Sequence, residues 1–153
     1  MSSGSDEAPA QGATGLRPRW RALGATIKLY LAVIAGGIIG SLVRWLVALV
    51  IPATMSGMPW ATLFANVTGC FVIGFYAALS GPDGRLFAGP RTRQFVMTGI
   101  CGGYTTFSGF SIEMLRLLMS GDTPLALIYL VLSLATWLAA VWLGDVLAEW
   151  LNS

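Results

Sequence analysis

The feature that most constrains this chain is a series of four long apolar stretches, nearly free of charge and joined by short polar segments. Each stretch can supply the roughly 20 apolar residues that a membrane-spanning helix needs. Only 10% of the 153 residues are charged, whereas a soluble domain has about 25%. A soluble fold could not cover this much apolar surface, so we expect an all-α integral membrane protein with four transmembrane helices.

The polar connections predict where the spans begin and end. A Gly-Pro-Asp-Gly turn at residues 81–84 closes the second stretch. Residues 1–26 are polar and rich in Ser, Gly and Pro, which is typical of a disordered tail. We expect one membrane domain at residues 27–150, with spans at about 27–51, 60–80, 94–119 and 124–147.

The third stretch contains a glycine-rich and hydroxyl-rich segment, residues 99–111, with four glycines and four Ser or Thr residues. Because Gly and Thr are poor helix formers, we predict a helix to about Cys101, a non-helical break near 102–106, and a second helix beyond it. Irregular backbone at membrane depth is tolerated only inside protein or beside a water-filled cavity. Its free carbonyl groups suit a cation such as Na⁺ or K⁺ rather than a transition metal.

Two polar residues inside the spans require a partner. Asn66 lies near the middle of the second span, where an unpaired polar group is costly. Its amide either bonds a neighbouring helix or donates to an anion in a pore. Arg44 lies well inside the first span, and its charge fits structural anchoring or the attraction of an anion.

Aromatic and hydroxyl side chains follow the break. Phe107 and Phe110 share a helix face and flank Ser108. They either pack as ordinary core or lipid-facing residues, or direct their electropositive ring edges along the path of a small anion. In the fourth span Tyr129 and Ser133 lie four residues apart. These two either continue a polar track or bond a neighbouring helix.

Small residues indicate where helices approach closely. Gly36, Gly37, Gly40 and Ser41 give overlapping pairs of small residues in the first span, a pattern typical of contacts between membrane helices. In the second span Asn66, Cys70 and Gly74 recur every four residues on one stripe, residues 66–74. We interpret both as packing faces. Glu113 lies near the far end of the third span, where we expect an interfacial position.

Several functions are excluded or disfavoured by composition. The chain has no histidine, so a histidine-based metal centre, proton relay or catalytic triad is excluded, and we expect no enzyme activity. Cys70 and Cys101 both lie inside apolar stretches and suggest neither a disulfide framework nor a zinc site. The net charge of +2, without a basic patch, disfavours nucleic-acid binding.

Three segments together resemble the CrcB/Fluc family of fluoride channels. They are Gly-Gly-Ile-Ile-Gly-Ser-Leu-Val-Arg-Trp at 36–45, Thr-Leu-Phe-Ala-Asn-Val-Thr-Gly-Cys-Phe at 62–71, and residues 99–113 with Gly-Gly-Tyr-Thr-Thr-Phe-Ser-Gly-Phe-Ser inside. With four spans, the resemblance covers about residues 27–148. Three motifs in the family's order, each on the expected span, make the resemblance specific.

The resemblance implies an antiparallel, dual-topology homodimer in which two oppositely inserted copies form two fluoride pores. It implies a structural Na⁺ at the dimer centre, held by backbone carbonyls of Gly102 and Thr105. It also implies that Phe107 and Phe110 turn ring edges to the anion and that Asn66 donates to it.

The same resemblance assigns lesser pore positions. Ser108 and Thr62 match polar positions, and Tyr129 and Ser133 match the start of a hydroxyl track; with Arg44 they complete the expected pore set. The track departs from the family at its next positions, Trp137 and Val141, and Gly109 stands where the family often has Thr.

The implied function is passive fluoride export across the bacterial inner membrane, which protects the cell against fluoride. A narrow pore must replace the tightly held water of fluoride with hydrogen-bond donors and still release the ion. Fluoride enters cells as neutral HF, ionises inside, and leaves through the channel.

The positive charges outside the membrane argue against mixed insertion. One side carries seven Lys or Arg residues and the other only Arg116, which favours both termini in the cytoplasm. Either insertion is nevertheless mixed, or the subunit has a fixed orientation and an oppositely inserted partner. We favour the homodimer on the resemblance. The seven are Arg17, Arg19, Arg21, Lys28, Arg85, Arg91 and Arg93.

Two other functions compete with a channel. A proton-coupled transporter of the small multidrug type also has four helices, but it needs a carboxylate deep in an early span, and the first two spans have none. A non-transporting membrane assembly subunit would leave Asn66 and the break without a purpose.

Overall fold

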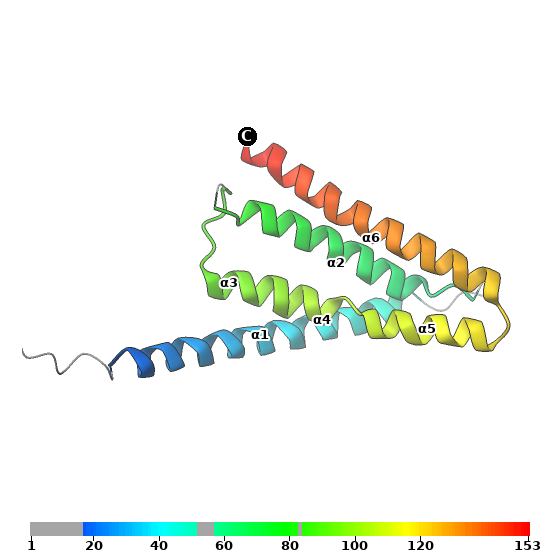
Figure 1. Ribbon diagram of the computed structural model, residues 1–153, viewed down its shortest axis with the longest axis horizontal. Helices are drawn as coiled ribbons and strands as arrows, with labels where there is room; N and C mark the ends of the chain where they lie inside the picture. Colours follow the sequence, from blue (N-terminus) through cyan, green and yellow to red (C-terminus); the bar gives the residue numbers. More distant parts are fainter. Residues whose placement is uncertain (1–16, 52–56, 83) are drawn as a thin grey trace, which may run out of the picture.

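All regular elements in the described part of the chain are helices (Figure 1). The computed structural model describes residues 17–51, 57–82 and 84–153. Most of the expected tail, the loop at 52–56 and Asp83 lie outside the described residues, as do the side chains of Arg17, Arg19 and Arg21. The elements are α1 (Arg17–Val50), α2 (Trp60–Leu79), α3 (Pro90–Gln94), the π-helix η1 (Phe95–Cys101), α4 (Gly102–Tyr104), α5 (Phe107–Met119) and α6 (Thr123–Asn152).

Three of these helices are long and apolar enough to cross a membrane, which makes this a helical membrane protein. They are α2, α6 and the Leu23–Val50 part of α1. The first helix begins at Arg17, so residues 17–26 of the expected tail are helical. The predicted third span is divided into shorter helices, none of which is such a candidate alone.

The helices associate mainly as two pairs, with α2 packed along α6 and α1 packed along η1 and α4 (Figure 1). A Cβ atom on Gly74 would meet the carbonyl oxygen of Val141 in α6, and one on Gly144 would meet that of Phe71 in α2. Glycine therefore lets these two backbones touch, as the small-residue rule for membrane helices requires.

The small face of α1 makes the helix contact that the sequence predicted. A Cβ on Gly36 would come within 2.5 Å of the Phe95 carbonyl oxygen, and one on Gly40 would collide with that of Ile100. Gly103 in α4 rests in turn on the backbone of Gly37.

The predicted stripe on α2 does not serve a single packing partner. Gly74 faces α6, whereas Asn66 is hydrogen-bonded to the helix break. The two residues lie two turns apart, so α2 meets different neighbours along its length.

The break in the third stretch is shorter than predicted. Gly102–Tyr104 is helical, and only Thr105 (φ −79°, ψ 156°) and Thr106 (φ −149°, ψ 118°) are extended. The prediction of a break over 102–106 was wrong at the glycines because packing against α1 overrides their low helix propensity. The predicted helix before Cys101 is also a π-helix rather than a regular α-helix.

The two threonines stabilise the break locally. The Thr105 hydroxyl donates to the Cys101 carbonyl oxygen at 2.9 Å. The Thr106 hydroxyl oxygen accepts from the backbone N–H of Gly109 at 2.9 Å and so caps α5. A capping threonine is worth about 1 kcal/mol, so the chain leaves and re-enters helix at these residues.

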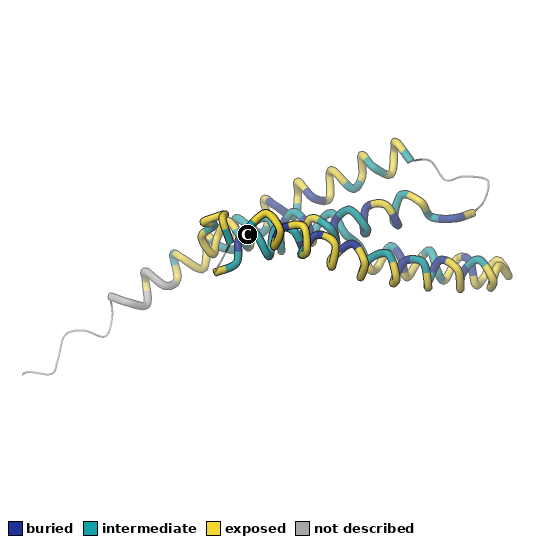
Figure 2. The backbone as a smooth tube through the Cα atoms, turned by 90° about the horizontal axis from the view of Figure 1, so that it is seen from above, coloured by how far each residue is buried: buried dark blue, intermediate teal, exposed yellow. Residues whose placement is uncertain are grey.

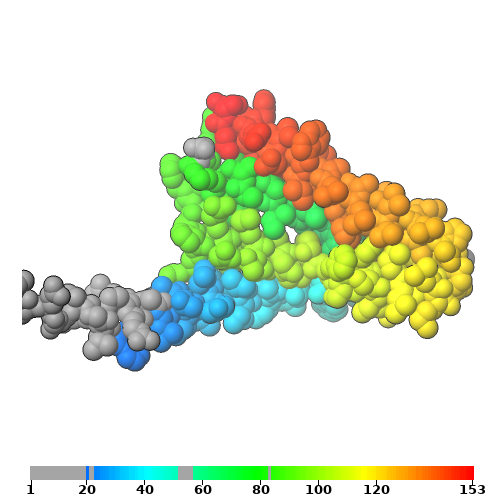
Figure 3. All heavy atoms as spheres, viewed as in Figure 1, coloured from blue at the N-terminus to red at the C-terminus, as the bar shows by residue number. Residues whose placement is uncertain are grey.

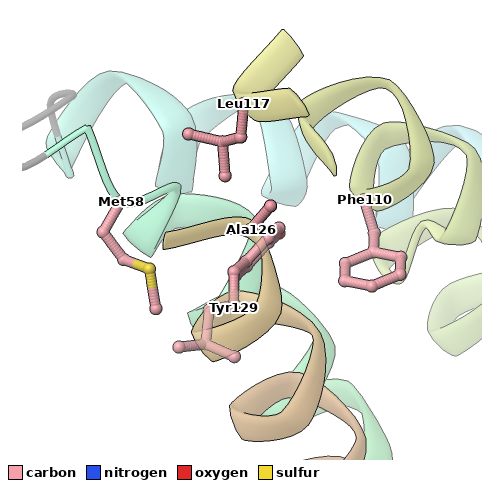
Figure 4. Packing of buried hydrophobic residues seen from close by; sticks show 6 residues of the cluster. Met58, Phe110, Leu117, Ala126 and Tyr129 are labelled. Atoms are coloured by element: carbon pink, nitrogen blue, oxygen red, sulfur yellow. The ribbon is translucent and has the colours of Figure 1, made fainter. Parts of the chain in front are cut away.

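The buried core is small and lies where α5 meets α6 (Figure 4). Phe110 and Leu117 of α5 face Ala126 and Tyr129 of α6. Elsewhere exposed residues recur along the helices (Figure 2), and many are large and apolar, as expected for a surface in contact with lipid. The space-filling view shows an opening between α2, α6 and the segment around the break (Figure 3).

Candidate ion pathway around the helix break

The extended backbone at Thr106 is held by the side chain of Asn66. The Asn66 Nδ2 donates to the Thr106 carbonyl oxygen at 3.0 Å, and Asn66 Oδ1 accepts from the Thr106 N–H at 2.7 Å. Asn66 is only 3% exposed. The amide thus makes a bond between spans, and the second N–H of its NH₂ group remains free to donate elsewhere.

Charge and hydroxyl groups from α1 meet the end of α4. The Gly103 carbonyl oxygen accepts from Arg44 Nε at 3.3 Å and Ser41 Oγ at 3.4 Å. The break removes this carbonyl's usual partner in the next helical turn, and a cation is favourable at a helix C-terminus. Arg44 therefore has an anchoring role, and its guanidinium keeps further N–H groups for other ligands.

Two carbonyl groups near the break, those of Gly102 and Thr105, are available to bind another group. Among the described residues, no hydrogen bond to the carbonyl oxygen of Gly102 or Thr105 is formed across the break or by a side chain. Gly102 is exposed on the surface of the single chain. These are the two positions at which the resemblance implies Na⁺, and free carbonyl oxygens are chemically suited to that ion.

A cavity of about 400 Å³ opens beside the break. It is half-open, and its walls come from α1, α2, α5 and the break. The polar residues that line it are Ser41, Arg44, Thr62, Thr106 and Glu113. A second cavity of about 490 Å³ shares Glu113 and adds Arg116. The two cavities bring cationic and hydrogen-bonding groups together.

Glu113 has partners that the sequence analysis did not predict. It is half-buried. Its Oε1 accepts from the Thr62 hydroxyl at 2.6 Å, and its Oε2 accepts from the Tyr129 hydroxyl at 2.8 Å. One carboxylate therefore joins α2, α5 and α6. A carboxylate within an apolar stretch indicates function by default, and that signal was present in the sequence.

The two phenylalanines after the break have different environments. Phe110 is 4% exposed and Phe107 is 69% exposed, although their ring centroids are 5.6 Å apart. The Phe110 ring also lies 5.1 Å from those of Tyr129 and Trp137. Phe110 thus belongs to the core of the single chain, while Phe107 presents its ring outside it.

The remaining predicted pore residues lie at the break or on α6. Ser108 lies beside the break, with its hydroxyl 3.2 Å from that of Thr106. Tyr129 and Ser133 are fully buried on α6. Arg44, Thr62 and Asn66 therefore lie around the break. On α6, Tyr129 packs against Phe110, and Ser133 follows one turn later. Phe107 and Gly102 lie on the surface.

Comparison with known proteins identifies the family. The family of CrcB-like proteins, described as Camphor Resistance (CrcB), matches residues 31–145. These residues include the break, Asn66 with its two hydrogen bonds to Thr106, and most of α6. This chain belongs to the CrcB family. The resemblance seen in the three sequence motifs is thereby confirmed.

Relatives of this CrcB chain are named fluoride channels. "Fluoride-specific ion channel FluC 1" of Rhodopseudomonas palustris is 59% identical over 125 residues, covering 81% of this chain and 89% of the relative. The protein of the same name from Bradyrhizobium diazoefficiens is 52% identical, covering 88% and 91%. "Fluoride-specific ion channel FluC" of Rhodospirillum rubrum is 48% identical, covering 80% and 96%. An ion-channel family agrees with the expectation that the chain is not an enzyme.

Proposed function

We propose that this CrcB chain is a subunit of a fluoride-selective channel that exports fluoride passively from the cytoplasm. The observation that carries the proposal is the extended backbone at Thr105–Thr106, held by Asn66 beside a polar cavity. Irregular backbone in a membrane belongs where protein or a conduit surrounds it. The names of the relatives support fluoride as the ion.

The selectivity of such a channel rests on donors that replace water. Fluoride is small and strongly hydrated, so its pore must offer N–H, O–H and electropositive ring edges at short range. Asn66 has a spare N–H, and Ser108 and the rings of Phe107 and Phe110 lie around the break. A pathway with neutral donors at its centre binds the ion without trapping it.

We propose that the predicted third stretch, residues 94–119, crosses the membrane as a fourth span and that two oppositely inserted copies form the channel. A second copy would close the opening beside the break (Figure 3) and cover the exposed ring of Phe107. In bacteria the channel would lie in the inner membrane.

A structural Na⁺ fits the dimer centre. The carbonyl oxygens of Gly102 and Thr105 would hold it, together with the same atoms of the second copy. When bound there, the ion would supply positive charge to offset the free carbonyl groups and would link the two copies. In a continuous helix these two carbonyls would accept from the N–H groups of Thr106 and Gly109. Here those N–H groups donate to Asn66 Oδ1 and Thr106 Oγ1 instead.

One observation favours a coupled carrier as the second candidate function. Glu113 is a carboxylate inside the predicted third span, and it bonds hydroxyl groups of two other helices. A carboxylate in that position is able to exchange protons with a substrate pathway. A proton-coupled transporter therefore remains the alternative to be tested.

Fluoride efflux from proteoliposomes, read with an ion-selective electrode, separates these functions. Fast efflux without a pH gradient supports the channel. Efflux that requires a proton gradient supports the carrier. Absence of fluoride movement from liposomes that contain correctly folded dimer rejects both and leaves the assembly role.

A further inference from the structure

Two buried polar atoms in the described part of the chain have no hydrogen-bond partner: the Ser133 hydroxyl and the Trp137 indole nitrogen, Nε1. Ser133 is 0% exposed. Buried polar groups are nearly always paired, and an exception calls for an explanation. Burying both groups without a partner is unfavourable, which indicates an acceptor from outside the described residues.

The two groups belong to one face of one helix. Tyr129, Ser133 and Trp137 follow one another at four-residue spacing on α6, so each lies about 6 Å of helix rise beyond the last. Tyr129 opens this row, and its hydroxyl already donates to Glu113. Ser133 and Trp137 are the members of the row that lack an acceptor.

Phe110 covers the same row. Its ring centroid is 5.1 Å from the Tyr129 ring and 5.1 Å from the Trp137 ring, and it meets Trp137 at 73° in an edge contact. Phe110 itself is 4% exposed. The ring therefore sits over the stretch of α6 that carries the unpaired groups and fixes the plane of the indole beside it.

The chemistry of the pair selects an acceptor. An indole N–H donates and never accepts, while a serine hydroxyl has one proton to donate. A dehydrated halide ion is an acceptor that can take hydrogen bonds from more than one donor. A hydroxyl rotates, whereas the packed indole holds its N–H in one direction.

We propose that the Trp137 N–H acts as a further donor to fluoride beyond Phe110, next to the Ser133 O–H that the resemblance already assigns to the hydroxyl track. This inference rests on the proposed fluoride channel and adds a residue to it. Trp137 is the next residue after Tyr129 and Ser133 at four-residue spacing, and its indole N–H supplies a donor where the row of hydroxyl residues ends. Trp137 is then a determinant of fluoride passage rather than a core filler.

The decisive variant removes only the indole N–H. Replacing Trp137 with β-(3-benzothienyl)alanine keeps the bicyclic shape and exchanges N–H for sulfur. We expect fluoride efflux to fall by about tenfold or more, with unchanged elution and thermal unfolding of the purified protein. The same replacement at Trp142, which is 62% exposed on α6, is the matched control and should conduct as the wild type does.

A spectroscopic measurement tests binding separately from flux. In protein labelled with ¹⁵N at the indole nitrogens, the Trp137 signal is assigned by its loss in W137F. We expect it to move downfield on titration with NaF but not with an equal concentration of sodium gluconate, and S133A should weaken the fluoride dependence. A Trp137 signal that ignores fluoride overturns the proposal, since water or another neutral acceptor then pairs the group.

The outcomes distinguish this inference from the channel itself. If the wild type conducts fluoride and the Trp137 isostere conducts equally well, the assignment of Trp137 as a donor is wrong and the channel stands. If the folded wild type conducts no fluoride, the proposed function fails, and the inference fails with it.

Discussion

The side-chain amide of Asn66 in α2 pairs with both backbone groups of Thr106, donating to its carbonyl oxygen at 3.0 Å and accepting from its N–H at 2.7 Å. The pair has the pattern of one rung of a β-ladder, formed between a helix side chain and an extended residue. It satisfies groups that a continuous helix would have paired internally. The break therefore depends on α2 for its shape.

Replacing Asn66 with Ala should destabilise the protein and slow fluoride efflux strongly. Each buried backbone group left unpaired costs about 1–3 kcal/mol, and both belong to Thr106. Thermal unfolding in detergent and efflux from proteoliposomes measure the two effects. Cys70→Ala, one turn further along α2 and free of a disulfide, is the control. Equal unfolding temperatures for the two variants would show that the two Asn66–Thr106 hydrogen bonds do not stabilise the break.

Replacing Glu113 with Gln should weaken the junction of α2, α5 and α6. The carboxylate accepts from both Thr62 and Tyr129, whereas a glutamine amide has one accepting oxygen and a donating NH₂ group. We expect a loss of about 1–3 kcal/mol in the free energy of unfolding. Glu149→Gln, at an exposed position on α6, should have little effect.

A double-mutant cycle sharpens this prediction. Because Tyr129→Phe removes a donor to the same carboxylate, its effect and that of Glu113→Gln should be less than additive. Fully additive losses would show that the 2.8 Å contact contributes nothing to stability.

Gly40→Ala should destabilise the protein, and Gly24→Ala should not, although both glycines lie in α1. A Cβ on Gly40 would collide with the carbonyl oxygen of Ile100, whereas one on Gly24 meets nothing within 4 Å. Overpacking costs about 1–3 kcal/mol, while Ala in place of an unpacked helical Gly gains about 0.5–1 kcal/mol. Opposite shifts of unfolding temperature are expected, and a stabilising Gly40→Ala would refute the tight contact.

The two phenylalanines should separate stability from conduction. Phe110→Ile should slow fluoride efflux by about tenfold or more and lower the unfolding temperature, because it loses its contacts with Tyr129 and Trp137. Phe107→Ile should slow efflux with a smaller effect on unfolding, since its ring is 69% exposed in the single chain. Wild-type efflux in both variants would remove them from the pathway.

Removal of Na⁺ tests the proposed ion at the break. Exchanging Na⁺ for N-methyl-D-glucamine during purification should lower the unfolding temperature and the dimer fraction, because the Gly102 and Thr105 carbonyls would then have no cation to neutralise them. Size-exclusion chromatography and thermal unfolding follow both, and returning Na⁺ should restore them. Identical behaviour without Na⁺ would mean that these carbonyls bind no structural cation.

The broad architecture was readable from the chain, while the details of the break were not. The apolar stretches predicted α2 within a residue of its ends, and the Gly36–Gly40 face predicted a close helix contact, which the structure shows to be with η1. Low propensity at Gly102 and Gly103 predicted a break that packing against Gly37 prevents. The actual break lies at the two threonines, whose hydroxyls bond the adjacent backbone.

The sequence by itself determined that the chain is a helical membrane protein of the CrcB family. The length of an apolar stretch and the order of motifs can both be read along the chain without knowing how it folds. Only the tertiary structure decided that Asn66 pairs with Thr106 and that Glu113 joins three helices. It also decided that the Ser133 hydroxyl and the Trp137 indole N–H find no partner among the described residues. Which donor meets which acceptor depends on how neighbouring helices rotate and approach, and a residue's own segment does not contain that information.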